Sequence, residues 1–162
     1  MTKNIENLNW TSGSGVKTTM NEISCFVKEN TASGAKIYIG TDSFVSKSSV
    51  IFASAICLYQ KDVVSRYFFS KTRQKKEKYE SLINRLLEET KKSIEIGVYL
   101  NKKCQINSNF IELHLDISPF HLKNATSKFS DMLKAYAAGS GFNCKLKPDA
   151  WASQSVADRH SK

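Results

Sequence analysis

The chain has 162 residues, which is enough for about one domain with its own apolar core. Lysine and arginine outnumber aspartate and glutamate by 24 to 15, and the net charge of +9 favours a polyanionic partner such as nucleic acid. The four cysteines lack zinc-ligand spacing, no apolar leader opens the chain, and no stretch approaches the roughly 18 apolar residues of a membrane span. We therefore expect a reduced, cytoplasmic protein without a membrane partner.

The first half of the chain predicts one helix and three strands. Apolar residues at helical spacing within 16–30 predict a leading amphipathic helix. Strand-like segments follow at 36–42, 50–60 and 63–70, and the short gaps between them predict an antiparallel meander. The middle segment, "VIFASAICLYQ", is apolar almost throughout, as in a strand that is buried on both faces.

The second half alternates helices with strands. We expect a long helix over 75–100, a strand over 110–118, a helix over 124–140, a strand over 142–148 and a last helix from Ala150. The predicted order is thus a leading helix followed by β-β-β-α-β-α-β-α, an α/β class. We divide the chain into an N-terminal extension, 1–35, and a main domain, 36–162.

This order brings acidic residues to one edge of the sheet. A long helical crossover returns the chain in its original direction, so strands one, three, four and five end at the same edge, where ligand sites of open α/β sheets collect. Asp42 ends strand one and Asp116 ends strand four, while Asp149 and Asp158 follow strand five. Taken alone, "GTDS" also suits a simple turn, because all four residue types favour turns.

Helical phase selects one glutamate of the long helix. With Ile83 at the centre of the apolar stripe, Glu80 lies about 60° from the centre, at the buried margin. Glu77, Glu88 and Glu89 lie about 120–140° away, towards solvent, and Glu89 is also about 13 Å further along the helix. We therefore expect Glu80 to join Asp42 and Asp116.

A cluster of carboxylates predicts a divalent cation. Neighbouring carboxylates repel one another unless they share a cation. Oxygen ligands favour Mg²⁺ or Mn²⁺ over zinc, and three or four carboxylates suit a pair of ions that promotes hydrolysis of a phosphodiester.

The same segments resemble a known family. "IGTDS", "KYESL", "LHLDIS" and the tail "KPDAWASQSVADRHSK" are similar to the ribonuclease H superfamily, and in particular to its small bacterial and phage YkuK-type family, over roughly 36–162. The resemblance implies a mixed five-stranded sheet, with a three-stranded antiparallel meander followed by two parallel strands and with flanking helices. It also implies a metal-dependent nuclease with catalytic and metal-binding residues Asp42, Glu80, Asp116 and Asp158.

The tail residues have other interpretations. Ser155 and Asp158 have the spacing of a helix capping box. Asp149 after Pro148 suits an N-cap. The histidine-bearing loop of well-understood ribonucleases H is not evident, and His160 is either a surface residue or a group that orients water or assists product release.

A basic run, "SKTRQKKEKYE", lies beside the predicted acids. We expect its cations to hold a nucleic-acid backbone without reading its sequence, although a solvated charged face is the ordinary explanation of such runs. The residues are Lys71, Arg73, Lys75, Lys76 and Lys78.

The sequence thus predicts a nuclease that uses two Mg²⁺ or Mn²⁺ ions and acts on RNA or an RNA/DNA hybrid. Two alternatives stay open: a non-catalytic nucleic-acid-binding module on the same fold, and a structure-specific DNA junction resolvase.

Overall fold

The computed structural model describes residues 2–63, 65–119 and 124–162. Three antiparallel strands occupy the first half and helices alternate with short strands in the second, as the sequence predicts. The elements in chain order are α1 (Thr2–Glu6), β1 (Trp10–Ser12), β2 (Lys17–Thr18), α2 (Met20–Ala32), β3 (Lys36–Val45), β4 (Ser49–Tyr59), β5 (Arg66–Lys75), η1 (Lys76–Tyr79), α3 (Leu82–Val98), η2 (Tyr99–Lys103), η3 (Ser108–Phe110), β6 (Ile111–His114), η5 (Ser127–Phe129), α4 (Ser130–Gly139), β7 (Asn143–Lys145), η6 (Ala152–Ala157) and α5 (Asp158–Ser161).

The sheet confirms the predicted arrangement and adds to it. Its order is β2-β1-β5-β4-β3-β6-β7. β3, β4 and β5 form the antiparallel meander, and β6 and β7 run parallel to β3. The sheet therefore has seven strands instead of the expected five. The two additional strands, β1 and β2, come from the segment that we expected to contribute only a helix, and β1 joins the sheet by pairing the buried Trp10 with Ser70 of β5.

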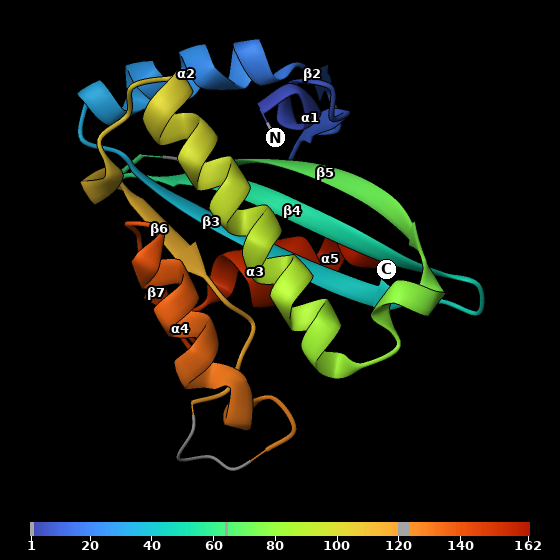
Figure 1. Ribbon diagram of the computed structural model, residues 1–162. Helices are drawn as coiled ribbons and strands as arrows, with labels where there is room; N and C mark the ends of the chain where they lie inside the picture. The colour runs from blue at the N-terminus through green and yellow to red at the C-terminus, as the bar shows by residue number, and fades with distance from the viewer. Residues whose placement is uncertain (1, 64, 120–123) are drawn as a thin grey trace.

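Helices cover the two faces of the sheet unequally. In Figure 1, α2, α3 and α4 lie on one face, and the C-terminal helix α5 lies on the other. Isoleucines and leucines of β3 and β6 fill the core between the sheet and the larger helical layer. Within the described ranges, no helix combines the length and the hydropathy that a membrane crossing requires.

The region between β5 and α3 differs from the expected long helix. β5 extends to Lys75, a 3₁₀ turn follows, and α3 begins only at Leu82. The N-cap of α3 is Ser81, whose side chain accepts a hydrogen bond from the Asn84 N–H. Three of the five basic residues, Lys71, Arg73 and Lys75, consequently lie on a strand. These three residues are exposed, while Thr72 and Gln74 between them are half-buried, as the two-residue period of strand side chains requires.

The C-terminal segment packs directly on the strands. Ala152 and Ala157 contact Ala55 and Cys57 of β4 in a small apolar cluster. The Ala152 N–H donates to Nδ1 of His114, which is buried on β6, at 3.1 Å. Burial lowers the pKa of His114, against the opposing effect of Glu112, and this favours the neutral ring that can accept the bond.

Gly40 makes this close approach possible. A Cβ at Gly40 would overlap backbone atoms of Ala152 and Ser153, with the Ala152 carbonyl carbon only 2.6 Å away. Gly40 pairs with His114 in the parallel register of β3 and β6. The two residues therefore define the place on the sheet where the C-terminal segment docks.

We expect Gly40→Ala to destabilise the protein by about 1–3 kcal/mol, because a methyl group there must push the backbone of Ala152 and Ser153 off the sheet. Urea unfolding measures this change. The matched control is Gly139→Ala at the end of α4, where an added Cβ meets nothing within 4 Å. That variant should unfold at the same or a higher urea concentration. Equal midpoints for Gly40→Ala and the wild-type protein would contradict the docking described above.

Candidate active site

Asp42 lies near the C-terminal end of β3 and faces the C-terminal helix. Only 8% of its surface is exposed, and its Oδ2 accepts a hydrogen bond of 2.8 Å from the Ser161 hydroxyl of α5. Burial raises the pKa of Asp42 to about 7. The Ser161 bond opposes this shift, and the charges of Asp116 and Asp158 add to it. Asp42 is therefore a desolvated carboxyl group with acidic neighbours, and a bound divalent cation would stabilise its ionised form.

Glu89 is the second buried carboxyl group, and it approaches β3 from the other face. It lies in α3, is 8% exposed, and accepts a 2.5 Å hydrogen bond from Ser43, the residue that follows Asp42. Burial raises the pKa of Glu89 to about 8. The Ser43 bond lowers it, and the charges of Asp42 and Asp116 raise it. The mutual effect places Glu89 within electrostatic range of two other acids.

This arrangement corrects the expected positions of Glu80 and Glu89. Glu80 precedes the first turn of α3 and is exposed, whereas Glu89 is buried. The predicted stripe is buried at Leu86, Thr90 and Ile94, but Leu87 is 36% exposed. The buried face of α3 therefore includes polar residues, Glu89 and Ser93, beside the apolar ones.

A polar layer between α3 and the sheet explains the difference. The Ser93 hydroxyl lies 3.0 Å from that of Thr41, which in turn lies 2.9 Å from that of Ser54 on β4. All three side chains are buried, and Ser43 and Glu89 continue the layer towards the strand end. Threonine and serine on alternate residues of β3 are the sequence signal that would have indicated a polar helix face here.

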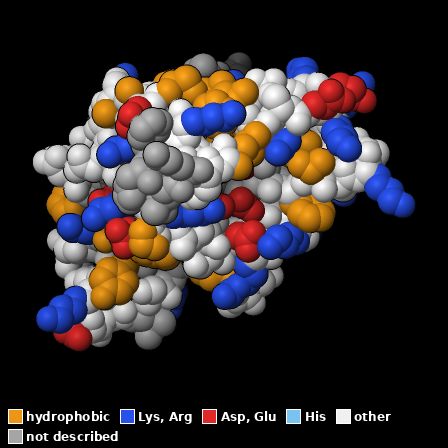
Figure 2. Space-filling view, turned by 90° about the horizontal axis from the view of Figure 1, so that it is seen from below, with side chains coloured by type: hydrophobic (Ala, Val, Ile, Leu, Met, Phe, Trp, Pro, Cys, Tyr) orange, Lys and Arg blue, Asp and Glu red, His pale blue; other side chains and the backbone are white. Residues whose placement is uncertain are grey.

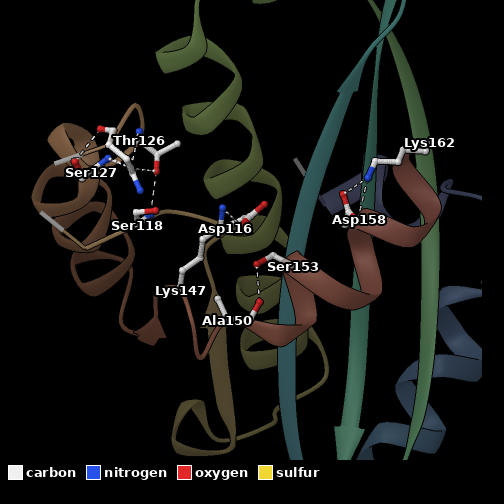
Figure 3. A network of polar contacts seen from close by, with 10 residues as sticks. Asp116, Ser118, Thr126, Ser127, Lys147, Ala150, Ser153, Asp158 and Lys162 are labelled. Carbon is white, nitrogen blue, oxygen red and sulfur yellow. Dashed lines mark hydrogen bonds and ion pairs between the residues drawn. The ribbon is translucent and has the colours of Figure 1, made fainter. Parts of the chain in front are cut away.

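Asp116 and Asp158 lie on separate elements beside Asp42. Asp116 follows β6, and the Lys147 ammonium lies 2.9 Å from its Oδ1. At this distance the two groups form an ion pair, with Asp116 mostly buried and Lys147 partly exposed. Asp158 begins α5 and pairs with Lys162 at 3.0 Å. Figure 3 shows the two carboxylates apart, each directed at its own lysine.

The other predictions for the tail have mixed outcomes. Asp158 follows a π-helical segment that contains Ser155, and the described hydrogen bonds of α5 include no capping box. Asp149 is exposed, with its backbone N–H bonded to Leu146 O. His160 is half-buried, stacked on Phe69 at a centroid distance of 3.6 Å and 3.1 Å from the Tyr67 hydroxyl. These contacts hold α5 against β5.

Basic and acidic side chains lie close together on one face of the molecule. Figure 2 shows acidic groups near the middle of the face that is seen from below, with lysine and arginine side chains on both sides. Lys71, Arg73, Lys75 and Lys78 are exposed, and Lys76 is half-buried. A hollow of about 680 Å³ lies elsewhere, between the β1–β2 ribbon, α2 and the start of β5.

The donor set suits a hard divalent cation. All four acids offer oxygen ligands, and two of them are buried carboxyl groups whose pKa values are raised by burial. Among the residues described, no three His, Cys, Asp or Glu side chains already stand close enough to hold one ion. Binding would therefore draw the carboxylates together, with Lys147 and Lys162 leaving the acids they now neutralise.

The comparisons with known proteins agree with this architecture. The family model described as "Ribonuclease H-like" matches residues 18–162, and the chain belongs to that family. Searches of curated proteins and of solved structures found no match. The family accounts for the α/β fold.

The two raised pKa values predict a pH-dependent stability in metal-free buffer. A carboxyl group whose folded pKa exceeds its unfolded value of about 4 stabilises the fold below that value, and this contribution is lost as the pH rises through the folded pKa. The free energy of unfolding of the wild type should therefore fall relative to that of Glu89→Gln from pH 5 to 8. The relative fall is at most about 1.4 kcal/mol per pH unit. Urea unfolding in EDTA at several pH values measures this fall.

The neighbouring variant Glu88→Gln serves as the control. Glu88 is half-buried and forms an ion pair with Lys92. Its stability difference from the wild type should stay constant between pH 6 and 8. If Glu89→Gln and Glu88→Gln gave parallel curves, Glu89 would not be the desolvated acid described here.

Proposed function

We propose that the protein is a divalent-metal-dependent nuclease that hydrolyses phosphodiester bonds in RNA, either alone or paired with DNA. The observation that supports this most is the burial of Asp42 and Glu89 on either side of one strand end. Ionised carboxylates are costly to bury without a cation, and acids with perturbed pKa values in one place mark functional sites more often than structural ones. Membership of the ribonuclease H-like family agrees with this chemistry.

Asp42, Glu89, Asp116 and Asp158 would hold the metal, which is Mg²⁺ or Mn²⁺ by the oxygen character of the donors. Glu89 takes the place that the sequence predicted for Glu80. When bound, such ions lower the pKa of an attacking water and stabilise the leaving oxygen of a phosphodiester. The protein itself supplies position: Ser161 and Ser43 orient the two buried carboxyl groups through their hydroxyl protons.

The basic residues would hold the substrate. The exposed cations of β5, Lys71, Arg73 and Lys75, lie on the sheet face that carries Asp42. Phosphate contacts of this kind fix a strand without reading its bases. Lys147 and Lys162, once released from the acids, would add two further cations beside the scissile phosphate.

The non-catalytic alternative also has an observation in its favour. Lys147 and Lys162 already pair with Asp116 and Asp158, so half of the acidic cluster is neutralised without a metal. A module that only binds nucleic acid would keep these pairs in place and would show salt-sensitive binding without cleavage.

A cleavage assay separates the two functions. Labelled RNA, RNA/DNA hybrid, single- and double-stranded DNA and a four-way junction are each incubated with EDTA, Mg²⁺ or Mn²⁺. We expect metal-dependent cleavage of RNA or hybrid, and more than a 100-fold loss in Asp42→Asn and in Glu89→Gln, since even residues that only support a metal ligand cost about 10–100-fold. Glu80→Gln is the matched control and should keep near wild-type activity.

Two results would count against the proposal. Cleavage that persists in purified Asp42→Asn would show that the acids are not the catalytic groups. Loss of activity in Glu80→Gln with normal activity in Glu89→Gln would show that Glu80, and not Glu89, is the metal ligand. Circular dichroism and urea midpoints confirm that each variant is folded before its rate is compared.

A further inference from the structure

The face of the sheet that carries Asp42 continues beyond the C-terminal helix as an open surface. In the strand register, Asp42 pairs with Ala53, which pairs with Lys71. The next row on the same face is Phe44, Ile51 and Arg73. Side chains two residues apart share a face. We call the surface formed by Phe44, Ile51, Lys71, Arg73 and Lys75 the shelf.

The shelf lies close to the candidate active site. Lys71 is two strands from Asp42, about 10 Å at the usual strand spacing, with Ala53 of β4 between them in the register. The row of Phe44 and Arg73 is about 7 Å further along the strands. The shelf therefore lies next to α5, the helix that covers Asp42.

The composition of the shelf is unusual for a sheet face. Phe44 is 39% exposed, and Lys71, Arg73 and Lys75 are all exposed, whereas the opposite face of the same strands is covered by helices. An exposed ring on its own needs no explanation. Here the ring stands in a row with a guanidinium group and next to a row that contains a buried acid. Aromatic rings interleaved with cations are the combination by which proteins hold unpaired nucleic-acid strands.

Protection of the sheet edge is the competing explanation for the cations. β1 pairs with β5 only at residues 68–70, and charged side chains on an exposed edge prevent strands of other molecules from pairing there. That explanation accounts for Lys71, Arg73 and Lys75. It gives no role to the exposed ring of Phe44, which an edge-protecting surface would avoid.

We infer that the shelf binds an unpaired segment of nucleic acid that leads into the acidic site, with a base stacked on Phe44 and phosphates on Lys71, Arg73 and Lys75. This inference deepens the proposed function, because it names a single strand, or an unpaired end of a duplex, as the form of substrate at the site. A base inside a duplex keeps its faces covered by its neighbours and cannot stack on the ring.

Binding of a labelled single-stranded oligonucleotide in EDTA tests the stacking without any cleavage. We expect Phe44→Leu, which keeps an apolar side chain but removes the ring, to weaken binding roughly tenfold, and Phe44→Trp to restore it. Phe110→Leu is the matched control: Phe110 is 37% exposed but precedes β6, at the opposite edge of the sheet. A blunt duplex of the same sequence should not respond to Phe44→Leu.

The salt dependence tests the cations. Arg73→Gln combined with Lys75→Gln should reduce the slope of log Kd against log salt concentration by about 1.4, since each phosphate contact on a single strand contributes about 0.7. The control pair is Lys28→Gln with Lys134→Gln, which removes the same charge from exposed positions on α2 and α4. That pair should leave the slope near the wild-type value.

The outcomes separate this inference from the proposed function. Wild-type affinity in Phe44→Leu, or an equal response of the blunt duplex, would overturn the inference. An unchanged salt slope in the double variant would leave edge protection as the explanation of the cations and would also overturn it. Shelf-dependent binding without cleavage in Mg²⁺ or Mn²⁺ would support the inference while rejecting the nuclease proposal.

Discussion

The burial of two carboxyl groups against one strand end is the constraint on which the rest of the structure depends. Asp42 lies on one face of β3 and Glu89 approaches the other, and each accepts a hydrogen bond from a serine hydroxyl. These donors offset only part of the cost of removing a carboxylate from water, so burial still raises the pKa of both groups. A bound cation would therefore stabilise the ionised forms of these groups, and Asp116 and Asp158 lie near Asp42 at the same end of the strands.

The C-terminal segment completes this site, and small contacts fix its position. Gly40 lets the backbone of Ala152 and Ser153 lie directly on β3, and the buried ring of His114 accepts the Ala152 N–H. From this anchor the chain continues to α5, which delivers both the Ser161 donor and the Asp158 carboxylate. Stacking of His160 on Phe69 holds the far end of the helix against β5. Substitutions of Gly40 or His114, on which the C-terminal segment docks, should therefore alter the acidic site although neither residue is one of its acids.

The sequence allowed the meander, the two parallel strands and the acidic edge to be predicted, because alternation and crossover direction are local rules. It did not allow Glu89 to be found, since the phase of α3 was taken from apolar residues although its buried face also carries the polar Glu89 and Ser93. β1 and β2 are too short to carry a pattern and form only because β5 offers an unpaired edge. The basic run was expected at a helix start, but β5 continues through Lys75. Its cations at alternate positions therefore lie along one face of this strand.

The central claim is that the buried carboxyl groups form a divalent-metal site, and a crystal soaked in Mn²⁺ tests it most directly. The claim predicts an anomalous scattering peak bound by oxygens of Asp42 and of at least one acid among Glu89, Asp116 and Asp158, at roughly 2 Å. Lys147 or Lys162 should then have left its carboxylate. A manganese ion bound at Glu80 instead, or crystals in which Mn²⁺ occupies surface positions while Asp42 keeps only its bond from Ser161, would contradict it.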